Sequence, residues 1–157
     1  MTAPSSPLLT YIYLESGLLA LRVIGDWTSQ TGGKEIAAMV ASLAGKSISK
    51  VFVDLSGLTS SDAKSVNVTQ DAMDLQRVVE QGVQFAFYAH EGSLGFGMSR
   101  ILAAFSDPEN KSRLQVWCDA DGALESLGVA HSYTSLLNET DWSNGPRVRP
   151  SKFAGMR

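Results

Sequence analysis

A short apolar segment that leads into a polar turn constrains the fold of this chain more than any other stretch. Val51 to Leu55 is rich in β-branched and aromatic residues, and a run of small polar residues follows it. Asp62, a residue type that caps helix N-termini, then opens a long pattern of helical spacing that Gly82 ends. The stretch therefore predicts a buried strand, a loop from Ser56 to Ser61 and a helix from Asp62.

Strand and helix patterns alternate on both sides of this stretch and predict an α/β fold. Leu8 to Leu14 and Leu18 to Ile24 read as strands, and the short link between them ends in glycine, which is typical of an antiparallel hairpin. Further strands are predicted at Val83 to Ala89 and Arg113 to Cys118. We expect one layered domain in which an opening hairpin and then parallel strands form a mixed five-stranded sheet, with about four flanking helices.

Composition divides the chain into three parts. Residues 1–7 hold prolines and serines without a basic region followed by an apolar one, so we expect a flexible lead and no signal peptide. Residues 8–128 carry the strand and helix patterns. Residues 129–157 are rich in Ser, Asn, Thr, Gly and Pro, and beyond Asp141 they hold four basic residues and no acid. This last part is either a loosely ordered tail or a basic arm that touches an anionic surface or an acidic partner.

The charge and cysteine content narrow the class of protein. A net charge of -3 argues against a nucleic-acid-binding domain, which needs a basic face. The apolar runs are too short to span a membrane. Cys118 is the single cysteine, which excludes an intramolecular disulfide and is compatible with a reducing cytosol. We expect a cytoplasmic protein in which Cys118 packs as a small hydrophobic residue on its strand.

Two sets of motifs resemble known families. Asp54-Leu55-Ser56-Gly57-Leu58-Thr59, followed two residues later by Asp62, resembles the signature strand and loop of STAS domains, which include anti-sigma factor antagonists and cytosolic domains of anion transporters. Phe96-Gly97-Met98-Ser99-Arg100, Val116-Trp117-Cys118-Asp119 and Ala123-Leu124-Glu125-Ser126-Leu127 are similar to bacterial SpoIIAA-like proteins. Those proteins are grouped with STAS domains and with the lipid-binding Sec14 (CRAL-TRIO) fold.

The resemblance covers the chain from Leu8 to about Leu127 and implies a STAS-like fold. It also implies a bacterial regulatory module that acts in signalling by binding another protein. Partner binding would then lie on the loop after the central strand and on the helix that follows. The candidate partner-binding residues are Asp54, Ser60, Ser61, Asp62, Lys64 and Ser65.

One departure from the family bears on regulation. Phospho-regulated members have Asp-Ser-Ser-Gly or Asp-Ser-Thr-Gly at the start of this helix, whereas the matching residues here are Asp62-Ala63-Lys64-Ser65. Ala63 has no oxygen that could carry a phosphate, so the usual switch is absent at that position. Ser60, Ser61 and Ser65 lie close by, but capping and turn roles explain them better.

A second candidate site lies at Leu94-Gly95-Phe96-Gly97. A glycine-rich helix N-terminus could hold an anion, an exposed apolar edge could touch lipid or a partner, or the loop is simply tight and Phe96 packs on the core. The possible ligand or lipid contacts are Leu94, Phe96, Gly97 and Arg100. In the helix that follows, the apolar stripe should face the sheet and Arg100 should face solvent. The stripe consists of Met98, Ile101, Leu102 and Phe105.

Catalytic and metal chemistry have little support in the sequence. Asp54 and Asp62 could act with Ser60 or Ser61 as base and nucleophile, but no histidine is placed nearby and no Gly-x-Ser-x-Gly occurs. Asp54 is better explained as an acceptor for loop amides, and Asp62 as a helix cap. The two histidines and the cysteine lack metal-ligand spacing. We expect no catalytic residue, no metal and no cofactor.

Three functions stay open at this point. The first is a non-enzymatic STAS-like module that docks an unidentified protein. The second is a small lipid-binding or membrane-surface protein, peripheral to the inner face of the membrane. The third is an unrecognised enzyme. A homo-oligomer is compatible with each of them.

Overall fold

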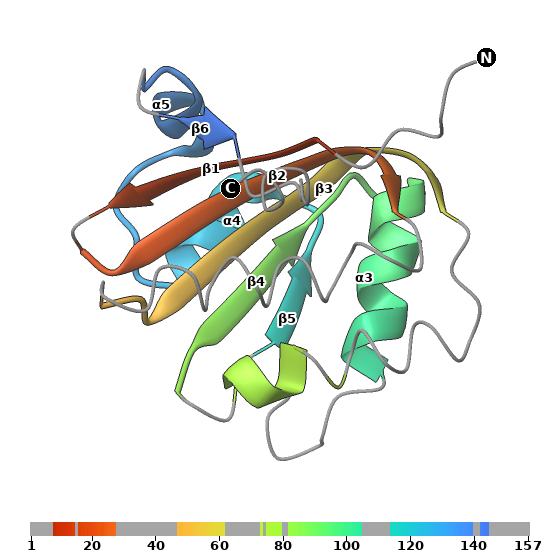
Figure 1. Ribbon diagram of the computed structural model, residues 1–157, viewed down its shortest axis with the longest axis horizontal. Coiled ribbons are helices and arrows are strands. Elements are labelled where there is room, and N and C mark those ends of the chain that lie inside the picture. The colour runs from red at the N-terminus through yellow and green to blue at the C-terminus, as the bar shows by residue number, and fades with distance from the viewer. Residues whose placement is uncertain are drawn as a thin grey trace, which may run out of the picture.

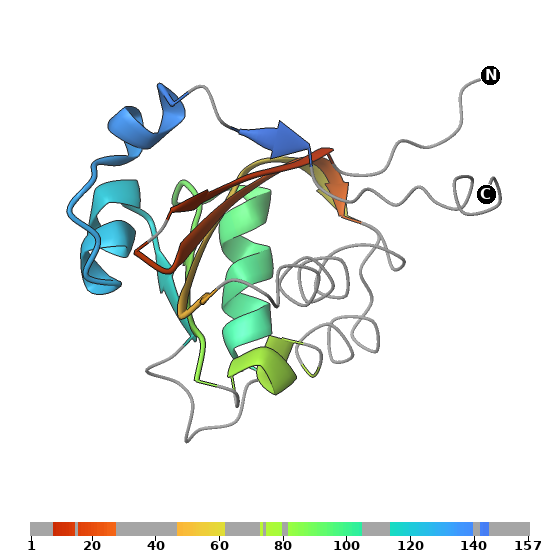
Figure 2. The same cartoon turned by 60° about the vertical axis from the view of Figure 1, so that its left-hand side comes forward.

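The computed structural model describes residues 8–14, 16–27, 47–61, 73, 75–79, 82–104, 114–139 and 142–144 of the chain. In these ranges a twisted sheet separates two helical layers (Figure 1 and Figure 2). The helix that the sequence predicts after Lys34 lies outside the described residues, and the one predicted from Asp62 is described only at residues 73 and 75–79, which are helical.

The sheet is mixed, as the sequence predicts. β1 (Leu8–Leu14) and β2 (Leu18–Trp27) form an antiparallel hairpin, and β3 (Lys50–Ser61), β4 (Gln84–Tyr88) and β5 (Leu114–Trp117) continue from β2 in parallel. A short sixth strand that the sequence did not indicate, β6 (Ser143–Asn144), pairs antiparallel with β1. The strand order is β5-β4-β3-β2-β1-β6, so β3 is central.

Helices cover both faces of the sheet. α3 (Leu94–Ala104) and residues 75–79 pack on one face, and α4 (Ala120–Ser126) and α5 (Tyr133–Leu137) lie on the other, as Figure 2 shows. Asp119 caps α4 by accepting the amide of Gly122 at 3.1 Å. Across the described part of the chain, no helix combines the length and the apolar character needed to cross a membrane.

Alternate residues of β3 supply two separate cores. Val51, Val53 and Leu55 face α3, whereas Phe52 faces α4 and α5, and all four side chains are fully buried. This follows from the two-residue period of a strand, which directs successive side chains to opposite faces. The predicted burial of Val51 to Leu55 inside the sheet is therefore confirmed.

The central strand is longer than the sequence predicts. β3 does not end at Leu55 but continues to Ser61, so the expected loop from Ser56 to Ser61 is wrong. β2 also continues, through Gly25 to Trp27, and pairs with this extension across two register shifts. Small polar residues indicate turns when taken alone, but here the paired neighbour strand supplies their backbone partners. β4 pairs with β3 only as far as Asp54.

Residues 129–157 were expected to form a loosely ordered extension. The part of it that the structure describes, residues 129–139 and 142–144, packs against the rest of the protein. Leu136 of α5 is fully buried against the α4 face of the sheet, and the Trp142 indole donates to the Leu136 carbonyl at 2.8 Å. Few large apolar residues are needed for this packing, which is why composition alone indicated a tail. The basic residues from Arg147 onward lie outside the described residues.

Candidate functional site

A row of residues with polar groups crosses the sheet on the face covered by α4 and α5. Arg22 of β2 lies opposite Asp54 of β3, Asp54 lies opposite Tyr88 of β4, and Tyr88 lies opposite Trp117 of β5. We call these four residues the polar row. By backbone register the row continues through Thr10 of β1 to β6. Residues paired directly across strands point to the same face, so the register alone brings these groups together.

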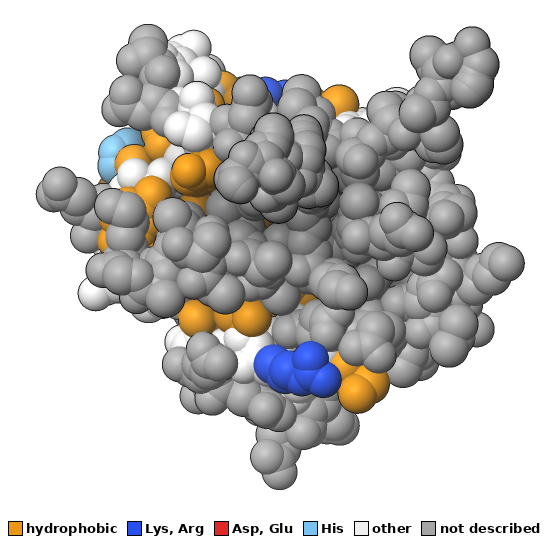
Figure 3. Space-filling model, viewed as in Figure 1, with side chains coloured by type: hydrophobic (Ala, Val, Ile, Leu, Met, Phe, Trp, Pro, Cys, Tyr) orange, Lys and Arg blue, Asp and Glu red, His pale blue; other side chains and the backbone are white. Residues whose placement is uncertain are grey.

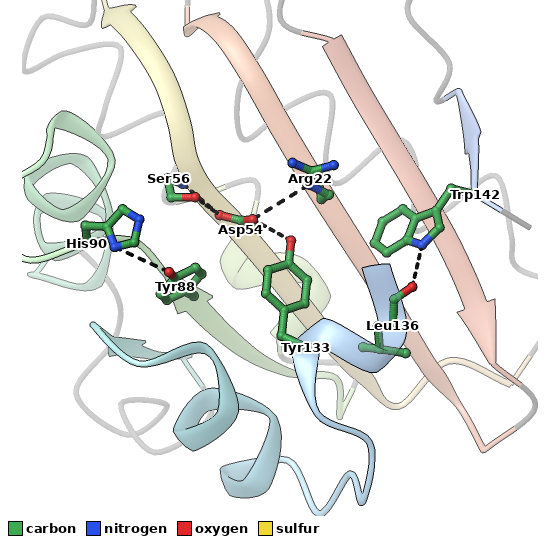
Figure 4. Close-up of polar contacts among 8 residues, drawn as sticks. All are labelled: Arg22, Asp54, Ser56, Tyr88, His90, Tyr133, Leu136 and Trp142. Carbon is green, nitrogen blue, oxygen red and sulfur yellow. Dashed lines mark hydrogen bonds and ion pairs between the residues drawn. The ribbon is translucent and has the colours of Figure 1, made fainter. Parts of the chain in front are cut away.

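Asp54 is the centre of the row and is only 4% exposed. Its Oδ1 accepts the Ser56 amide at 2.8 Å and the Ser56 hydroxyl at 2.6 Å. Its Oδ2 accepts the Tyr133 hydroxyl and faces Arg22 Nε at 3.8 Å (Figure 4). The expectation that Asp54 accepts a nearby backbone amide is confirmed. Both oxygens are engaged, so the buried charge has the hydrogen bonds it needs.

Tyr133 comes from α5 and lies over the row, 8% exposed. Its ring meets Phe52 edge-on at 5.0 Å and Tyr88 at 6.0 Å between centroids. Its amide donates to Asp121 Oδ1 at 2.8 Å, which ties α5 to α4. Burial, followed by the charge of Asp54 and the hydrogen bond to it, raises the pKa of Tyr133 far above its ordinary value, although Arg22 opposes the shift. Tyr133 was not among the residues selected from the sequence, because it lies in the segment predicted to be loose.

His90 contacts the polar row through Tyr88. The Tyr88 hydroxyl and His90 Nδ1 are 3.4 Å apart, and their rings meet edge-on at 5.7 Å (Figure 4). Burial, then the charges of Asp54 and Asp119, raise the pKa of Tyr88. Tyr88 is the last residue of β4, and side chains along an extended chain alternate between the two faces of the sheet. His90, two residues after Tyr88, is therefore the next side chain on the same face. That alternation was the available signal for this contact.

Two nitrogen atoms at this face are buried without a hydrogen bond. Among the described residues, neither Arg22 Nε nor Trp117 Nε1 has a partner within hydrogen-bond distance. The Trp117 ring lies beneath α4, where a Cβ added to Gly122 would come within 3.2 Å of it. Buried donors without partners are costly, so a rearrangement that supplies either atom with an acceptor would stabilise the protein.

The predicted partner-binding residues do not form one exposed surface in the described part of the chain. Asp54 is buried under α5 and is not available to a partner. Ser60 and Ser61 are the last residues of β3, and nothing is described of their side chains. Asp62, Lys64 and Ser65 lie outside the described residues, as does Ala63.

The second candidate site is an exposed helix N-terminus. Leu94 is 41% exposed, Gly97 has open space beside it, and Arg100 is exposed, as predicted for this arginine. Phe96 is half-buried and packs against the core, and the Arg100 guanidinium lies 5.9 Å above its ring. Two of the open interpretations therefore hold in part, since Phe96 packs inward while Leu94 projects outward.

One of the backbone amides that could bind an anion at the N-terminus of this helix already has a partner. The hydroxyl of Ser93 accepts the Phe96 amide at 3.2 Å, so this free amide is already capped. From the predicted apolar stripe, Met98 is buried, nothing is described of the side chains of Ile101 and Leu102, and Phe105 lies outside the described residues.

The two candidate sites adjoin each other. A Cβ added to Gly95 would lie 2.8 Å from the carbonyl carbon of Leu55, so the first turn of α3 lies directly against β3. At this point β3 has just separated from β4, whose pairing stops at Asp54. The second half of β3 and the start of α3 therefore form one edge of the molecule, which we call the β3–α3 edge (residues 55–61 and 93–97).

The other surface features are modest. A shallow hollow of about 250 Å³ lies between α3 and β5 and is lined by Arg100, Ala103, Ala104 and Leu114. On the side of the molecule that Figure 3 shows, a basic side-chain group lies beside hydrophobic side chains in the lower part of the picture. Cys118 is exposed, so the expectation that it packs inside is wrong, because β5 ends one residue before it. Among the described residues, no three His, Cys, Asp or Glu side chains cluster as metal ligands would.

Comparisons with known proteins give a fold neighbour. No protein-family model matches the chain, and no curated protein is similar to it. The structure is similar to the crystal structure of an uncharacterized protein of the DUF3478 family, with a SpoIIAA-like fold, from Shewanella loihica PV-4. The match covers 80% of this chain and 97% of that chain, with a TM-score of 0.49 and 16% sequence identity. The hairpin, the parallel strands and the flanking helices described above form an α/β fold with a mixed sheet.

Proposed function

We propose that this protein is a non-enzymatic STAS-like regulatory module that docks another protein through the β3–α3 edge. The observation that carries the proposal is Leu94, a large apolar side chain that is 41% exposed at this edge. The sequence resemblance puts partner binding after the central strand, and the contact between Gly95 and Leu55 makes Leu94 a neighbour of that stretch.

The size of this contact favours reversible docking. Fully burying a leucine side chain contributes about 1.5–3 kcal/mol before the costs of association. Arg100, exposed over the Phe96 ring, adds a cation at the rim of the same surface. An apolar anchor with a charged neighbour is the usual composition of a protein-binding patch.

The polar row supports a structural role for Asp54 over a catalytic one. Both carboxylate oxygens are engaged, and Tyr133 excludes solvent from them. A general base needs access to the proton that it removes.

The absence of a hydroxyl at position 63 supports docking without the phosphorylation switch of the family. Binding would then be controlled by the amount of partner or by the conformation of this chain. We propose a cytoplasmic location for this activity, compatible with a single exposed cysteine.

A membrane surface is the second candidate occupant of the same edge. The exposed Leu94 and the exposed Arg100 lie on the same helix, and proteins that lie on anionic membranes combine apolar and cationic side chains. One leucine contributes too little for stable anchoring by itself, since even a single acyl chain gives only marginal membrane binding. We therefore favour the protein partner.

Site-specific photocrosslinking in native extract tests the proposal. A photoreactive amino acid replaces Leu94 in one sample and Leu137 in the other, because both side chains are 41% exposed and Leu137 lies on the opposite helical layer. Mass spectrometry identifies crosslinked proteins and lipids. We expect one protein to be captured from position 94 and not from position 137. Equal capture at both positions would contradict docking at this edge, and capture of phospholipid alone would favour the membrane surface.

A further inference from the structure

Residues 129–139 cover the polar row, and few contacts hold them. The described side chains of this segment that are buried are Tyr133 and Leu136, whereas most of the others are exposed. α5 has only five residues and is too short to be stable without its packing. We call residues 129–139 the α5 cover.

The bond that closes the cover has a competitor already in place. Asp54 Oδ2 accepts the Tyr133 hydroxyl, while Arg22 Nε stands 3.8 Å from the same oxygen, beyond hydrogen-bond distance. That nitrogen is buried and has no hydrogen-bond partner among the described residues. Arg22 Nε therefore has no hydrogen-bond partner and lies 3.8 Å from an oxygen that already accepts the Tyr133 hydroxyl. Arg22 also acts on Tyr133 directly, because it opposes the rise in the pKa of that hydroxyl.

We propose that the α5 cover is a two-state device, closed when Tyr133 donates to Asp54 and open when Arg22 takes its place on the same oxygen. If Tyr133 left with no replacement, the buried carboxylate would lose a hydrogen bond, which is costly. A short move of Arg22 supplies a charged donor and removes that cost. The exchange also satisfies Arg22 Nε, so opening gains one ion-paired hydrogen bond as it loses the bond from the neutral Tyr133 hydroxyl.

Other contacts decide which state dominates. Leu136 is fully buried in the closed state, and the Trp142 indole donates to its carbonyl, so both favour closure. Opening exposes the ring of Phe52, which Tyr133 otherwise meets edge-on, with the pair of Arg22 and Asp54 beside it. The α5 cover thus controls access to a surface formed by the Phe52 ring and the adjacent charged pair of Arg22 and Asp54. It does not depend on the proposed docking at the β3–α3 edge.

Native-state hydrogen exchange of the full chain tests the device. The probe amides are those of Leu136, which donates to Ser132 O at 3.1 Å, and Asn138, which donates to Thr134 O at 3.2 Å. Each rate is divided by the rate of β3 amides in the same sample, because this ratio separates local opening from global unfolding. The ratio therefore remains meaningful in a variant of lower overall stability.

Two substitutions should move this ratio in opposite directions. Tyr133→Phe removes the closing bond and should raise the ratio at least about tenfold, the effect of losing a hydrogen bond to a charged group. Arg22→Met removes the competitor and should lower the ratio severalfold. Arg100→Met, the same change at an exposed arginine on the other layer, should leave it unchanged.

The arginine variant decides the proposal. If Arg22→Met leaves the ratio unchanged or raises it, Arg22 does not compete with Tyr133 and the two-state device is wrong. An unchanged ratio in Tyr133→Phe would also overturn it, because the hydroxyl would then not hold the cover. Should Arg22→Met fail to fold, Arg22→Leu also removes the guanidinium donors and is judged by the same outcomes.

Discussion

Gly95 in the first turn of α3 lies against the backbone carbonyl of Leu55 in β3, with no room for a side chain between them. The contact occurs where β3 separates from β4, so the helix takes the position that a neighbouring strand would otherwise hold. A glycine allows this approach because it has no Cβ. The contact fixes Leu94 and Phe96, the residues on either side, at the β3–α3 edge.

Replacing this glycine should therefore be costly. In Gly95→Ala the new methyl group meets backbone atoms that cannot rotate away, and we expect the free energy of unfolding to fall by about 1–3 kcal/mol. Urea denaturation measures the loss. Gly97→Ala is the matched control, since Gly97 lies in the same helix with open space beside it. There we expect a gain of about 0.5–1 kcal/mol from helix propensity. Similar effects for both variants would contradict the close contact.

Removal of the Tyr133 hydroxyl should destabilise the fold. Tyr133→Phe keeps the ring contacts with Phe52 and Tyr88 but takes a donor from the buried Asp54 carboxylate. Hydrogen bonds to charged groups contribute about 1.5–3 kcal/mol, and we expect a loss in this range by urea denaturation. Tyr13→Phe is the control, because its hydroxyl donates to Ser47 O at 3.3 Å near the surface, and it should change stability by less than about 0.5 kcal/mol.

The same tyrosine predicts a pH dependence. Its pKa is raised in the folded state above the ordinary 10.0, so the unfolded chain loses this proton at lower pH than the folded chain does. The contribution of Tyr133 to stability is complete below pH 10.0 and falls as the pH rises above it. The slope approaches about 1.4 kcal/mol per pH unit for one proton. Denaturation of wild type and Tyr133→Phe between about pH 8 and pH 11 measures this, since the variant lacks the group. A stability difference that is constant with pH would refute the raised pKa.

Vesicle flotation separates the two candidate occupants of the β3–α3 edge. If the partner is a protein, we expect neither wild type nor Leu94→Ser to float with anionic vesicles. Leu137→Ser controls for loss of an equally exposed leucine elsewhere. Circular dichroism confirms that each variant is folded. Flotation of wild type and Leu137→Ser, lost in Leu94→Ser, would replace the proposed partner with a membrane surface.

Phosphorylation should not switch partner binding. The resemblance to STAS domains matches Ala63 with the hydroxyl residue that is modified in their phospho-regulated members, so incubation with candidate kinases should leave residues 60–65 without stoichiometric phosphate. Phosphopeptide mapping measures this. A stoichiometric phosphate on Ser60, Ser61 or Ser65 that alters crosslinking from position 94 would show that the switch has moved to a neighbouring residue.

The sequence predicted β1 to β5 and their succession along the chain because their apolar patterns are strong, whereas it did not indicate β6. It predicted the end of β3 wrongly, because Ser56, Gly57 and Thr59 are typical of turns when read alone. Pairing with β2 overrides that local preference, and a Cβ on Gly57 would come within 2.9 Å of the Ile24 side chain. The need for a glycine at this position follows from a neighbour that lies far away in sequence.

The candidate site was less accessible to sequence reasoning. Asp54 was selected correctly as an acceptor for a nearby amide, since Ser56 is two residues away. Its bond to Tyr133 joins residues 79 positions apart, and its contact with Arg22 depends on strand register. No local pattern encodes either relationship. Exposure of Leu94 with inward packing of Phe96 also required the orientation of α3 on β3.

The polar row also bears on how the strands find their alignment as the protein folds. A one-residue slip of β3 would exchange its two faces and turn Asp54 towards Leu75, Val79 and Met98, an apolar environment. A carboxylate placed there without partners would cost several kcal/mol, so slipped pairings are rejected. A chain with leucine at position 54 would lack this penalty and could pair its strands in more than one way. One buried charge therefore makes the alignment of the central strands unique.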